Sequence, residues 1–180
     1  KDIPPEAPGS MENVYGLFNM AAPALYPLDD PVNYEPDLSE CIGARARASD
    51  VEPIDHLYDF LLEDGGRRFA SLSAIDLPAR MDVLQEMLLH PSTVTGLSDA
   101  GAHVTLICDG TMPTTQLTYW TRDRAKGEKI PLEFIVRKQT ALNAELYGFD
   151  DRGTLEVGKR ADVNVIDLDN LQVSPPVPHN

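Results

Sequence analysis

Apolar residues in the middle of the chain recur at the spacings of alternating helices and strands. Intervals of three and four residues before Gly65 predict a helix with an apolar face of Ile54, Leu57, Tyr58, Leu61 and Leu62. Residues 67–75 alternate between apolar and polar side chains, which predicts a strand. A second helix is expected next, capped by Asp76, with Pro78 in its first turn and one face lined by Met81, Leu84, Met87 and Leu88.

The second half of the chain continues this alternation. Residues 93–98 predict a short strand, and Pro113 and Pro131 each stand where a further helix is expected to begin. Gly148 should stop the last helix. That helix is expected to bury Ile135, Leu142 and Leu146. Because helices alternate with strands over roughly residues 53–147, the pattern indicates a parallel α/β architecture.

The two ends of the chain have different patterns. Seven of the fifteen prolines fall in residues 1–36, so this stretch is expected to be mostly loop. Asp37 and Glu40 have the spacing of a capping box, which predicts a short helix directly after them. Residues 160–168 alternate like a strand, and the proline-rich stretch after them cannot form a central strand.

Composition excludes several classes of partner. The net charge is −14, with 29 acidic against 15 basic residues, so we expect no nucleic acid and no anionic membrane surface as partner. No stretch reaches the ~18 apolar residues of a membrane span, and the first ten residues lack the apolar region of a signal peptide. Cys41 and Cys108 have no C-x-x-C spacing, which favours reduced thiols in a cytoplasmic protein.

Asp99 is the first candidate for chemistry, because it directly follows the strand predicted at residues 93–98. In parallel α/β folds, ligands bind beyond the carboxyl ends of the strands. The alternative is that the Asp99 carboxylate caps the following turn by accepting hydrogen bonds from backbone N–H groups. Position alone leaves both interpretations open.

Two stretches of the sequence resemble the amidohydrolase superfamily. The first is "HPSTVTGLSDAGAH" at residues 90–103, and the second is "PLEFIVRKQTALNAELYGFDDRGTLEVGKRADVNVIDLD" at residues 131–169. The most similar branch is that of the D-aminoacylases (N-acyl-D-amino-acid deacylases), which "YDFLLEDGGR" and "LQEMLLHP" also fit. The residues of the second stretch that have this family's spacing are Pro131, Arg137, Thr140, Ala144, Gly148, Gly153, Gly158, Lys159, Ala161 and Asp162.

The resemblance implies a fold and a reaction. The family fold is a metal-dependent-hydrolase (β/α)₈ (TIM-type) barrel with a small β-sandwich built from both chain ends. Residues 1–148 would belong to the barrel and residues 149–180 to the β-sandwich and a tail. Asp99 would end the eighth strand, bind a divalent metal, usually zinc, and act as general base. It would take a proton from the metal-bound water that attacks an amide carbonyl, and return it to the leaving nitrogen. The expected substrate is an N-acyl (D-)amino acid.

Other polar residues are weaker candidates. His103 could contact the substrate, although a histidine in a turn or on the surface is the simpler interpretation. His90 precedes the predicted strand and is expected to be structural. Cys108 and Asp109 could imitate a ligand pair, but adjacent residues of a strand point to opposite sides. Arg122 and Arg124 are interpreted as a solvated helix face, and residues 151–162, whose glycines suit turns, as a structural connection.

The remaining ligands that the family needs are not in this sequence. The family's metal site needs an H-x-H pair on the first strand, a bridging Lys, Cys or Glu, and two later histidines. The four histidines of this sequence, at positions 56, 90, 103 and 179, form no H-x-H pair and do not have the matching spacing. A (β/α)₈ barrel takes ~250 residues. We therefore expect a C-terminal portion that is inactive and holds no tightly bound zinc by itself, and that self-associates or binds the missing N-terminal part. The alternative function is a non-catalytic α/β assembly or binding module.

Overall fold

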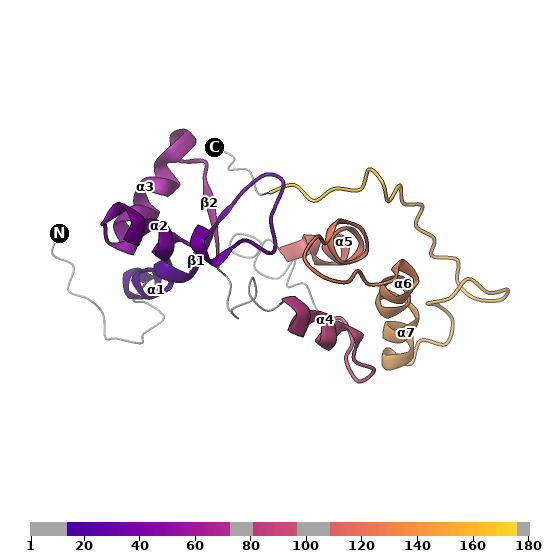
Figure 1. Cartoon of the computed structure of the whole chain (residues 1–180). Helices are drawn as coiled ribbons and strands as arrows, with labels where there is room; N and C mark the ends of the chain where they lie inside the picture. Colours follow the sequence, from indigo (N-terminus) through magenta and orange to yellow (C-terminus); the bar gives the residue numbers. More distant parts are fainter. Residues whose placement is uncertain (1–13, 73–80, 97–108, 176–180) are drawn as a thin grey trace. The chain divides into compact units, whose positions relative to one another are not determined.

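The computed structural model describes residues 14–72, 81–96 and 109–175 (Figure 1). The chain divides into two compact units, one of residues 1–81 with 174–180 and one of residues 82–173. In the described ranges, no helix is long and apolar enough to cross a membrane.

The first unit combines helices with a two-stranded sheet. Its helices are α1 (Val14–Ala21), α2 (Ile42–Ser49) and α3 (Pro53–Gly66), with short 3₁₀ turns at Ala22–Ala24 (η1) and Leu38–Glu40 (η2). Strand β1 (Leu25–Leu28) pairs antiparallel with β2 (Phe69–Leu72), so that Leu25 stands opposite Leu72. The core of this unit is formed by Ala22, Leu25, Ile42, Leu57 and Phe60.

The helix predicted after Asp37 begins where its caps place it. The Glu40 carboxylate accepts a hydrogen bond from the Asp37 N–H (3.0 Å), and Cys41 Sγ accepts one from the Ala44 N–H (3.3 Å). These contacts satisfy N–H groups that have no partner inside a helix. A Cβ at Gly43 would lie 2.7 Å from the Pro23 carbonyl oxygen, so a glycine is needed where α2 packs against η1.

The prediction that residues 1–36 are mostly loop is wrong for the part that is described. Residues 14–28 form α1, η1 and β1 in succession. The prolines are accommodated at permitted positions: Pro23 lies in the first turn of η1, and Pro27 lies in a strand of a two-stranded sheet. Counting prolines therefore overestimates the loop content here.

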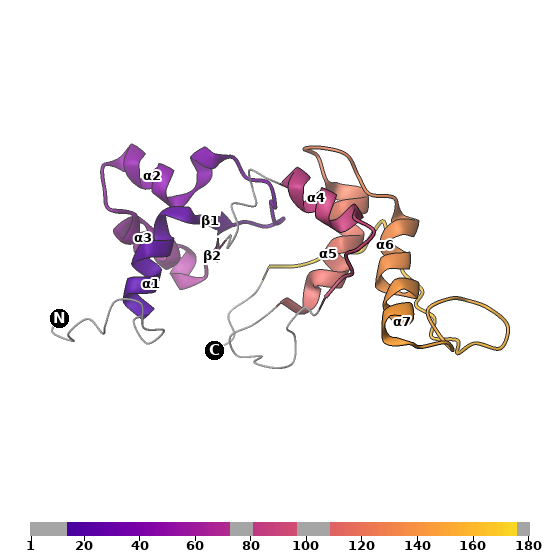
Figure 2. The same cartoon turned by 90° about the horizontal axis from the view of Figure 1, so that it is seen from below.

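The second unit contains helices in its described part. They are α4 (Met81–Leu89), the 3₁₀ turn η3 (Asp109–Thr111), α5 (Met112–Thr118), the π-helical turn η4 (Tyr119–Asp123), α6 (Leu132–Gln139) and α7 (Ala141–Tyr147). Met81, the first residue of α4, is counted with the first unit. Figure 2 shows α4, α5 and α6 side by side. Its buried apolar side chains are Leu117, Tyr119, Trp120, Ile130, Ile135 and Ala144.

The predicted parallel sheet is absent from the described ranges, where the one sheet is two-stranded and antiparallel. Residues 93–96 form no strand, and residues 97 and 98 lie outside the description. The strand predicted at residues 160–168 is also absent, and Val165 is 98% exposed. A strand needs a hydrogen-bonded neighbour. A segment whose apolar and polar residues alternate therefore forms no strand where no described segment lies beside it to pair with it.

The apolar faces of the predicted helices are narrower than expected. In α3, Leu57 and Phe60 are buried, whereas Tyr58 and Leu62 are exposed. Three predicted core residues in other helices are exposed or only half-buried: Met87, Leu142 and Leu146. A spacing pattern marks one side of a helix, but the area that is buried depends on how many neighbours cover that side.

The helix predicted from Pro131 to Gly148 is two helices. The backbone leaves helical geometry at Thr140 (φ −120°, ψ −83°), between α6 and α7. Gly148 stops α7 as predicted, because it adopts a left-handed φ of +71° and donates its N–H to the Ala144 and Glu145 carbonyls. The break lets Lys138 and Asn143 reach the same segment of chain, residues 93–96.

Candidate functional site

The main candidates from the sequence lie in a part of the chain that is not described. Asp99, His103 and Cys108 fall within residues 97–108, and the helix cap Asp76 falls within residues 73–80. Their roles therefore stay predictions. The structure does describe the segment Thr93–Gly96, which leads to Asp99 three residues later in the sequence.

Lys138 of α6 anchors the beginning of this segment. Its side chain is 1% exposed, and its ammonium donates hydrogen bonds to the Thr93 carbonyl (2.9 Å), to Thr93 Oγ1 (2.9 Å) and to the Leu88 carbonyl. The ammonium also lies 5.7 Å from the ring centre of Phe134, within the range of a cation–π contact. Burial lowers the pKa of the Lys138 ammonium. The hydrogen bonds of the ammonium thus all go to one short stretch of the chain, residues 88–93.

Thr93 and Thr95 complete the attachment from the side of the segment. The Thr93 hydroxyl lies 2.6 Å from the Met87 carbonyl oxygen and 2.9 Å from that of His90, and so ties the segment to the end of α4. Thr95 Oγ1 lies 3.4 Å from the Lys138 carbonyl and accepts a hydrogen bond from Asn143 Nδ2 at 3.3 Å. The segment is therefore bonded to α4, α6 and α7.

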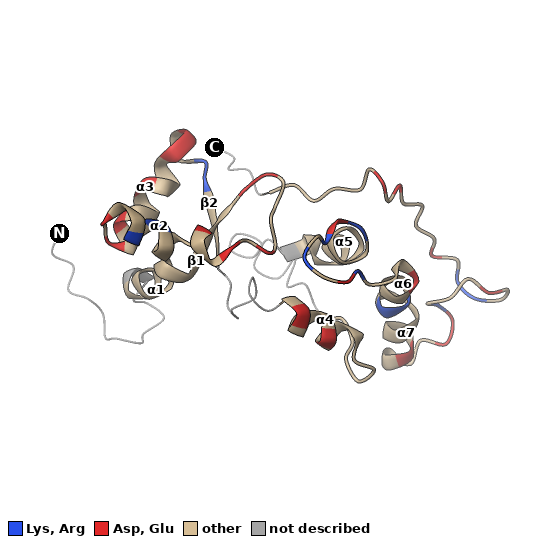
Figure 3. Ribbon diagram, viewed as in Figure 1, with Lys and Arg blue, Asp and Glu red and all other residues tan. Residues whose placement is uncertain are grey.

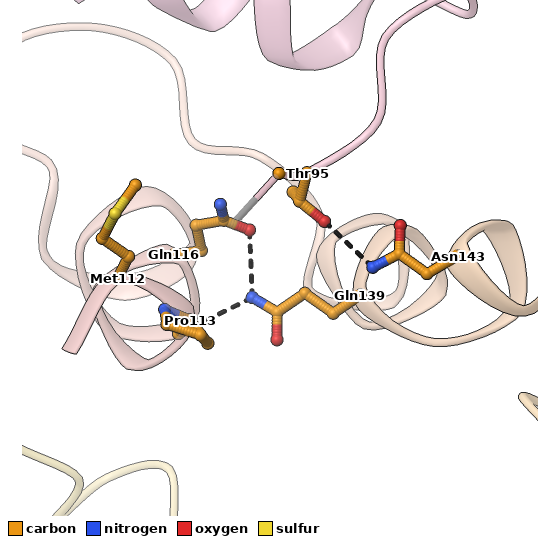
Figure 4. Close-up of a pocket in the computed structure, with 7 residues that line it drawn as sticks. Thr95, Met112, Pro113, Gln116, Gln139 and Asn143 are labelled. Carbon is orange, nitrogen blue, oxygen red and sulfur yellow. Dashed lines mark hydrogen bonds between the residues drawn. The ribbon is translucent and has the colours of Figure 1, made fainter. Parts of the chain in front are cut away.

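A cavity of about 310 Å³ lies beside this attachment (Figure 4). Gln139 Nε2 donates to Gln116 Oε1 and to the Pro113 carbonyl, both at 3.0 Å, and so joins α6 to α5 across the cavity. Within the described ranges, the side-chain oxygen Oδ1 of Asn143 is buried and has no hydrogen-bond partner. The lining is Thr95, Gly96, Met112, Pro113, Gln116, Gln139 and Asn143. These described lining residues are uncharged and contribute hydrogen-bonding groups, and none of them is a general base or a charged metal ligand.

Arg124 corrects the prediction of a solvated arginine face. It is 2% exposed, and its guanidinium donates to Asp82 Oδ1 (2.6 Å), Gln85 Oε1 (2.8 Å) and the Glu128 carbonyl (3.1 Å). It also lies 5.0 Å from the ring centre of Trp120. Its five N–H donors allow one side chain to connect several groups. Arg124 therefore joins α4 to the loop that precedes α6.

Arg122 is also engaged, although it is partly accessible. It forms a two-pronged ion pair with Asp123 (2.6 and 2.7 Å) and donates to the carbonyls of Leu168, Asp169 (3.3 Å) and Leu171 (3.0 Å). The hydrogen bond from Arg122 holds the pKa of the Asp123 carboxyl below its usual value, and the same pair raises the pKa of Arg122. Arg122 thus fastens the C-terminal segment to η4.

The described residues do not fit a metal ion. No group of three or more His, Cys, Asp or Glu side chains comes together in the described ranges. The acidic residues in Figure 3 are spread over α3, α4, α6, α7 and the C-terminal segment. His90 makes a local contact, in which its Nδ1 accepts a hydrogen bond from the Ser92 N–H at 3.2 Å. This contact agrees with the structural role predicted for His90.

Sequence reasoning did not identify Lys138 or Asn143 as functional candidates. A signal for Lys138 was present, because it follows the buried Ile135 by three residues and so stands on the buried face of its helix. A lysine at such a position must find acceptors for its ammonium. Asn143 and Thr95 have no comparable signal, since their contact depends on the break at Thr140.

Comparison with known proteins identifies the family. The Amidohydrolase family matches residues 42–180. An uncharacterized protein of Mycobacterium tuberculosis and one of Mycobacterium bovis are each 33% identical over 138 residues, which is 76% of this chain and 22% of theirs. An imidazolonepropionase of Agrobacterium fabrum is 34% identical over 139 residues, 73% of this chain and 32% of its own length.

The chain thus spans between a fifth and a third of the length of the curated relatives that it matches. No solved structure gives a significant match. The D-aminoacylase branch is not among these relatives, so the comparisons support the resemblance at the level of the family. A family match that covers most of the chain, together with relatives at a third identity, establishes that this protein belongs to the amidohydrolase family.

Proposed function

We propose that this chain is the C-terminal part of a metal-dependent amidohydrolase that hydrolyses an amide C–N bond. The observation that carries the proposal is the family match over residues 42–180, which includes both stretches that resemble the family, 90–103 and 131–169. The choice of an N-acyl (D-)amino acid as substrate rests on the resemblance of those stretches to the D-aminoacylase branch.

The proposed fold of the complete enzyme is a (β/α)₈ barrel with a small β-sandwich. Residues 1–148 would contribute to the barrel and residues 149–180 to the sandwich. The exposed apolar side chains of the C-terminal segment support this assignment, because a soluble enzyme would cover them: Leu155, Val157, Val163 and Val165. The cover would come from a partner, either the N-terminal part of the enzyme or a second copy of this chain.

In this proposal Asp99 is both a metal ligand and the general base. Its carboxylate accepts a proton from the attacking water and delivers it to the leaving nitrogen, so that the amine departs uncharged. His103, four residues later in the sequence, contacts the substrate. The metal, which we propose to be zinc, supplies polarisation of the amide carbonyl when it is bound. We propose that its other ligands come from the part of the enzyme that carries the H-x-H pair, which this sequence lacks.

The proposed location is the cytoplasm. A reducing compartment suits the two cysteines, of which Cys41 is a free thiol that caps α2. Neither thiol has a function in the proposed reaction.

The test uses the complete enzyme, in which this chain is joined to or mixed with the part that supplies the H-x-H pair. Hydrolysis of N-acetyl-D- and N-acetyl-L-amino acids and bound zinc are measured for the native enzyme and for Asp99→Asn. Asp150→Asn is the matched control, because it removes an exposed carboxylate elsewhere. We expect Asp99→Asn to abolish hydrolysis and Asp150→Asn to leave it unchanged.

Two results would contradict the proposal. Full hydrolysis by Asp99→Asn would remove Asp99 from the reaction. A native complete enzyme that binds no metal and hydrolyses no amide would favour the alternative, a non-catalytic α/β assembly or binding module.

A further inference from the structure

We infer that Lys138, together with Asn143, is a positioning residue that sets the path of residues 93–96 and so the direction from which the chain continues to Asp99. The part of this inference that concerns Asp99 rests on the proposed function. The part that concerns residues 93–96 rests on the described contacts alone.

The Lys138 ammonium is buried and depends on acceptors from outside its own helix. Removing an ammonium from water is costly unless it is fully hydrogen-bonded, and an ammonium has three hydrogens to donate. Lys138 is 1% exposed, and its acceptors are the Leu88 carbonyl, the Thr93 carbonyl and Thr93 Oγ1. Because none of the three acceptors belongs to α6, the lysine can be satisfied only when the other segment is in place.

A second pair of contacts holds the segment at Thr95, two residues after Thr93. Asn143 Nδ2 donates to Thr95 Oγ1, while Thr95 Oγ1 also lies within hydrogen-bond distance of the Lys138 carbonyl. Residues 93 and 95 are thus held from two helices, α6 and α7, whose relative direction is set by the break at Thr140. Two attachment points two residues apart fix the register of an extended segment, whereas one point would let it pivot.

Side chains, and no regular element of the described ranges, hold residues 93–96. In the described ranges, residues 93–96 have no strand partner and belong to no helix. Side-chain contacts from α6 and α7 therefore replace the backbone ladder that would otherwise hold such a segment. We expect the loss of one contact to loosen residues 93–96 while the cores around Trp120 and Ile135 stay packed.

The test measures backbone order of the 180-residue chain by ¹⁵N relaxation. In the native chain, the order parameters of residues 93–96 should approach those of α6, about 0.8 or higher. Lys138→Met and Thr95→Val should lower them toward about 0.6, and leave α5 unchanged. The Lys138 ammonium should give an observable ¹⁵N–¹H signal at neutral pH, since burial slows its exchange with water.

Lys159→Met is the matched control. It also removes a lysine from this unit, but Lys159 bonds to Thr154 and Glu156 within its own turn. It should leave residues 93–96 unchanged. If Lys138→Met does not fold, Thr95→Val still tests whether these contacts order residues 93–96. This variant removes one hydroxyl from a half-buried position and keeps the shape of the side chain, so it should fold. Unchanged order of residues 93–96 in the folded variants would overturn the inference.

A second measurement separates this inference from the proposed function. In the complete enzyme, Thr95→Val and Lys138→Met should lower kcat by on the order of tenfold to a hundredfold, with KM and zinc content close to native. A native kcat in both variants would contradict the positioning of Asp99, even if residues 93–96 become mobile. If Asp99→Asn is fully active, the proposed function fails, while the relaxation result for residues 93–96 stands.

Discussion

At the scale of single residues, buried cations organise the second unit. Lys138 and Arg124 each direct their hydrogen bonds at segments distant in sequence, and both are almost inaccessible to solvent. Removing one partner of such a hydrogen bond leaves a buried charge or acceptor unpaired, and this costs free energy. Buried cations stabilise a fold mainly in this way. The sequence does not distinguish Arg124 from a surface cation, because its acceptors Asp82 and Gln85 lie about 40 positions away.

Arg124→Met should destabilise the chain by roughly 2–3 kcal/mol, since it removes the charged donor of Asp82 Oδ1 and Gln85 Oε1 and leaves the Glu128 carbonyl only its hydrogen bond from Gln85 Nε2. Urea denaturation followed by tryptophan fluorescence reports the change, because Trp120 lies against Arg124. The control is Arg152→Met, whose ion pair with the adjacent Asp151 is exposed, so this variant should change the free energy of unfolding much less. Equal losses in the two variants would contradict the role of Arg124.

The Arg122–Asp123 pair predicts a dependence on acid. The pKa of Asp123 is lower in the folded chain than its ordinary value of 3.8, chiefly because Arg122 donates hydrogen bonds to it. Its contribution to stability is therefore complete above pH 3.8 and is lost as the pH falls through the folded pKa.

Carboxyl ¹³C shifts measured during an acid titration check this dependence. The titration midpoint of Asp123 should lie below 3.8 in the native chain and rise toward that value in Arg122→Gln. Lys129 also lowers this pKa, so some shift should remain in the variant. A midpoint that is the same in both proteins would show that Arg122 is not the main cause.

At the scale of elements, local sequence predicts helices better than it predicts strands. Helices α2, α3, α5 and α6 begin near the residues where the sequence predicts them, because caps, prolines and apolar spacing act within a few residues. Gly148 was identified as a stop for the same reason. The predicted start of α4, at Asp76 and Pro78, lies outside the described residues. Strand β1 was missed, and the strand at residues 160–168 was predicted where none is described, because pairing depends on segments far away in sequence.

The turn after α7 offers a test of element packing. A Cβ at Gly153 would lie 2.7 Å from the Ala144 Cβ, and Gly153 has a φ of +90°. Gly153→Ala should destabilise the chain by about 2–3 kcal/mol through strain and overlap together. Gly158 has a similar φ of +93° but open space around its Cβ, so Gly158→Ala should cost only about 1 kcal/mol.

Thermal or urea unfolding of these two variants separates the two effects. Their difference measures the close approach of the turn to α7, because the backbone strain is shared. If Gly158→Ala costs as much as Gly153→Ala, the turn does not pack against α7 in solution.

At the scale of the whole molecule, the chain leaves many large apolar side chains exposed. In the second unit these include Tyr147, Leu155, Val157 and Val165. Burial of apolar area gives about 25 cal/mol per Å², and charge repulsion at physiological salt is screened beyond roughly 8 Å. A net charge of −14 therefore does not prevent association.

We expect the isolated 180-residue chain to self-associate at low micromolar concentration. Sedimentation velocity should show a dimer or a larger species, and addition of the part that supplies H-x-H should replace it with a mixed complex. A compact monomer that melts cooperatively would contradict the proposal that this chain needs a partner to cover its apolar side chains.

We propose that this chain brings Asp99 to the metal of an amidohydrolase. An anomalous-scattering map at the zinc absorption edge, from crystals of the complete enzyme, tests it most directly. A carboxylate oxygen of Asp99 should lie at about 2.0–2.2 Å from the zinc ion. A zinc ion bound entirely by other residues, with the Asp99 carboxylate outside its coordination sphere, would contradict it.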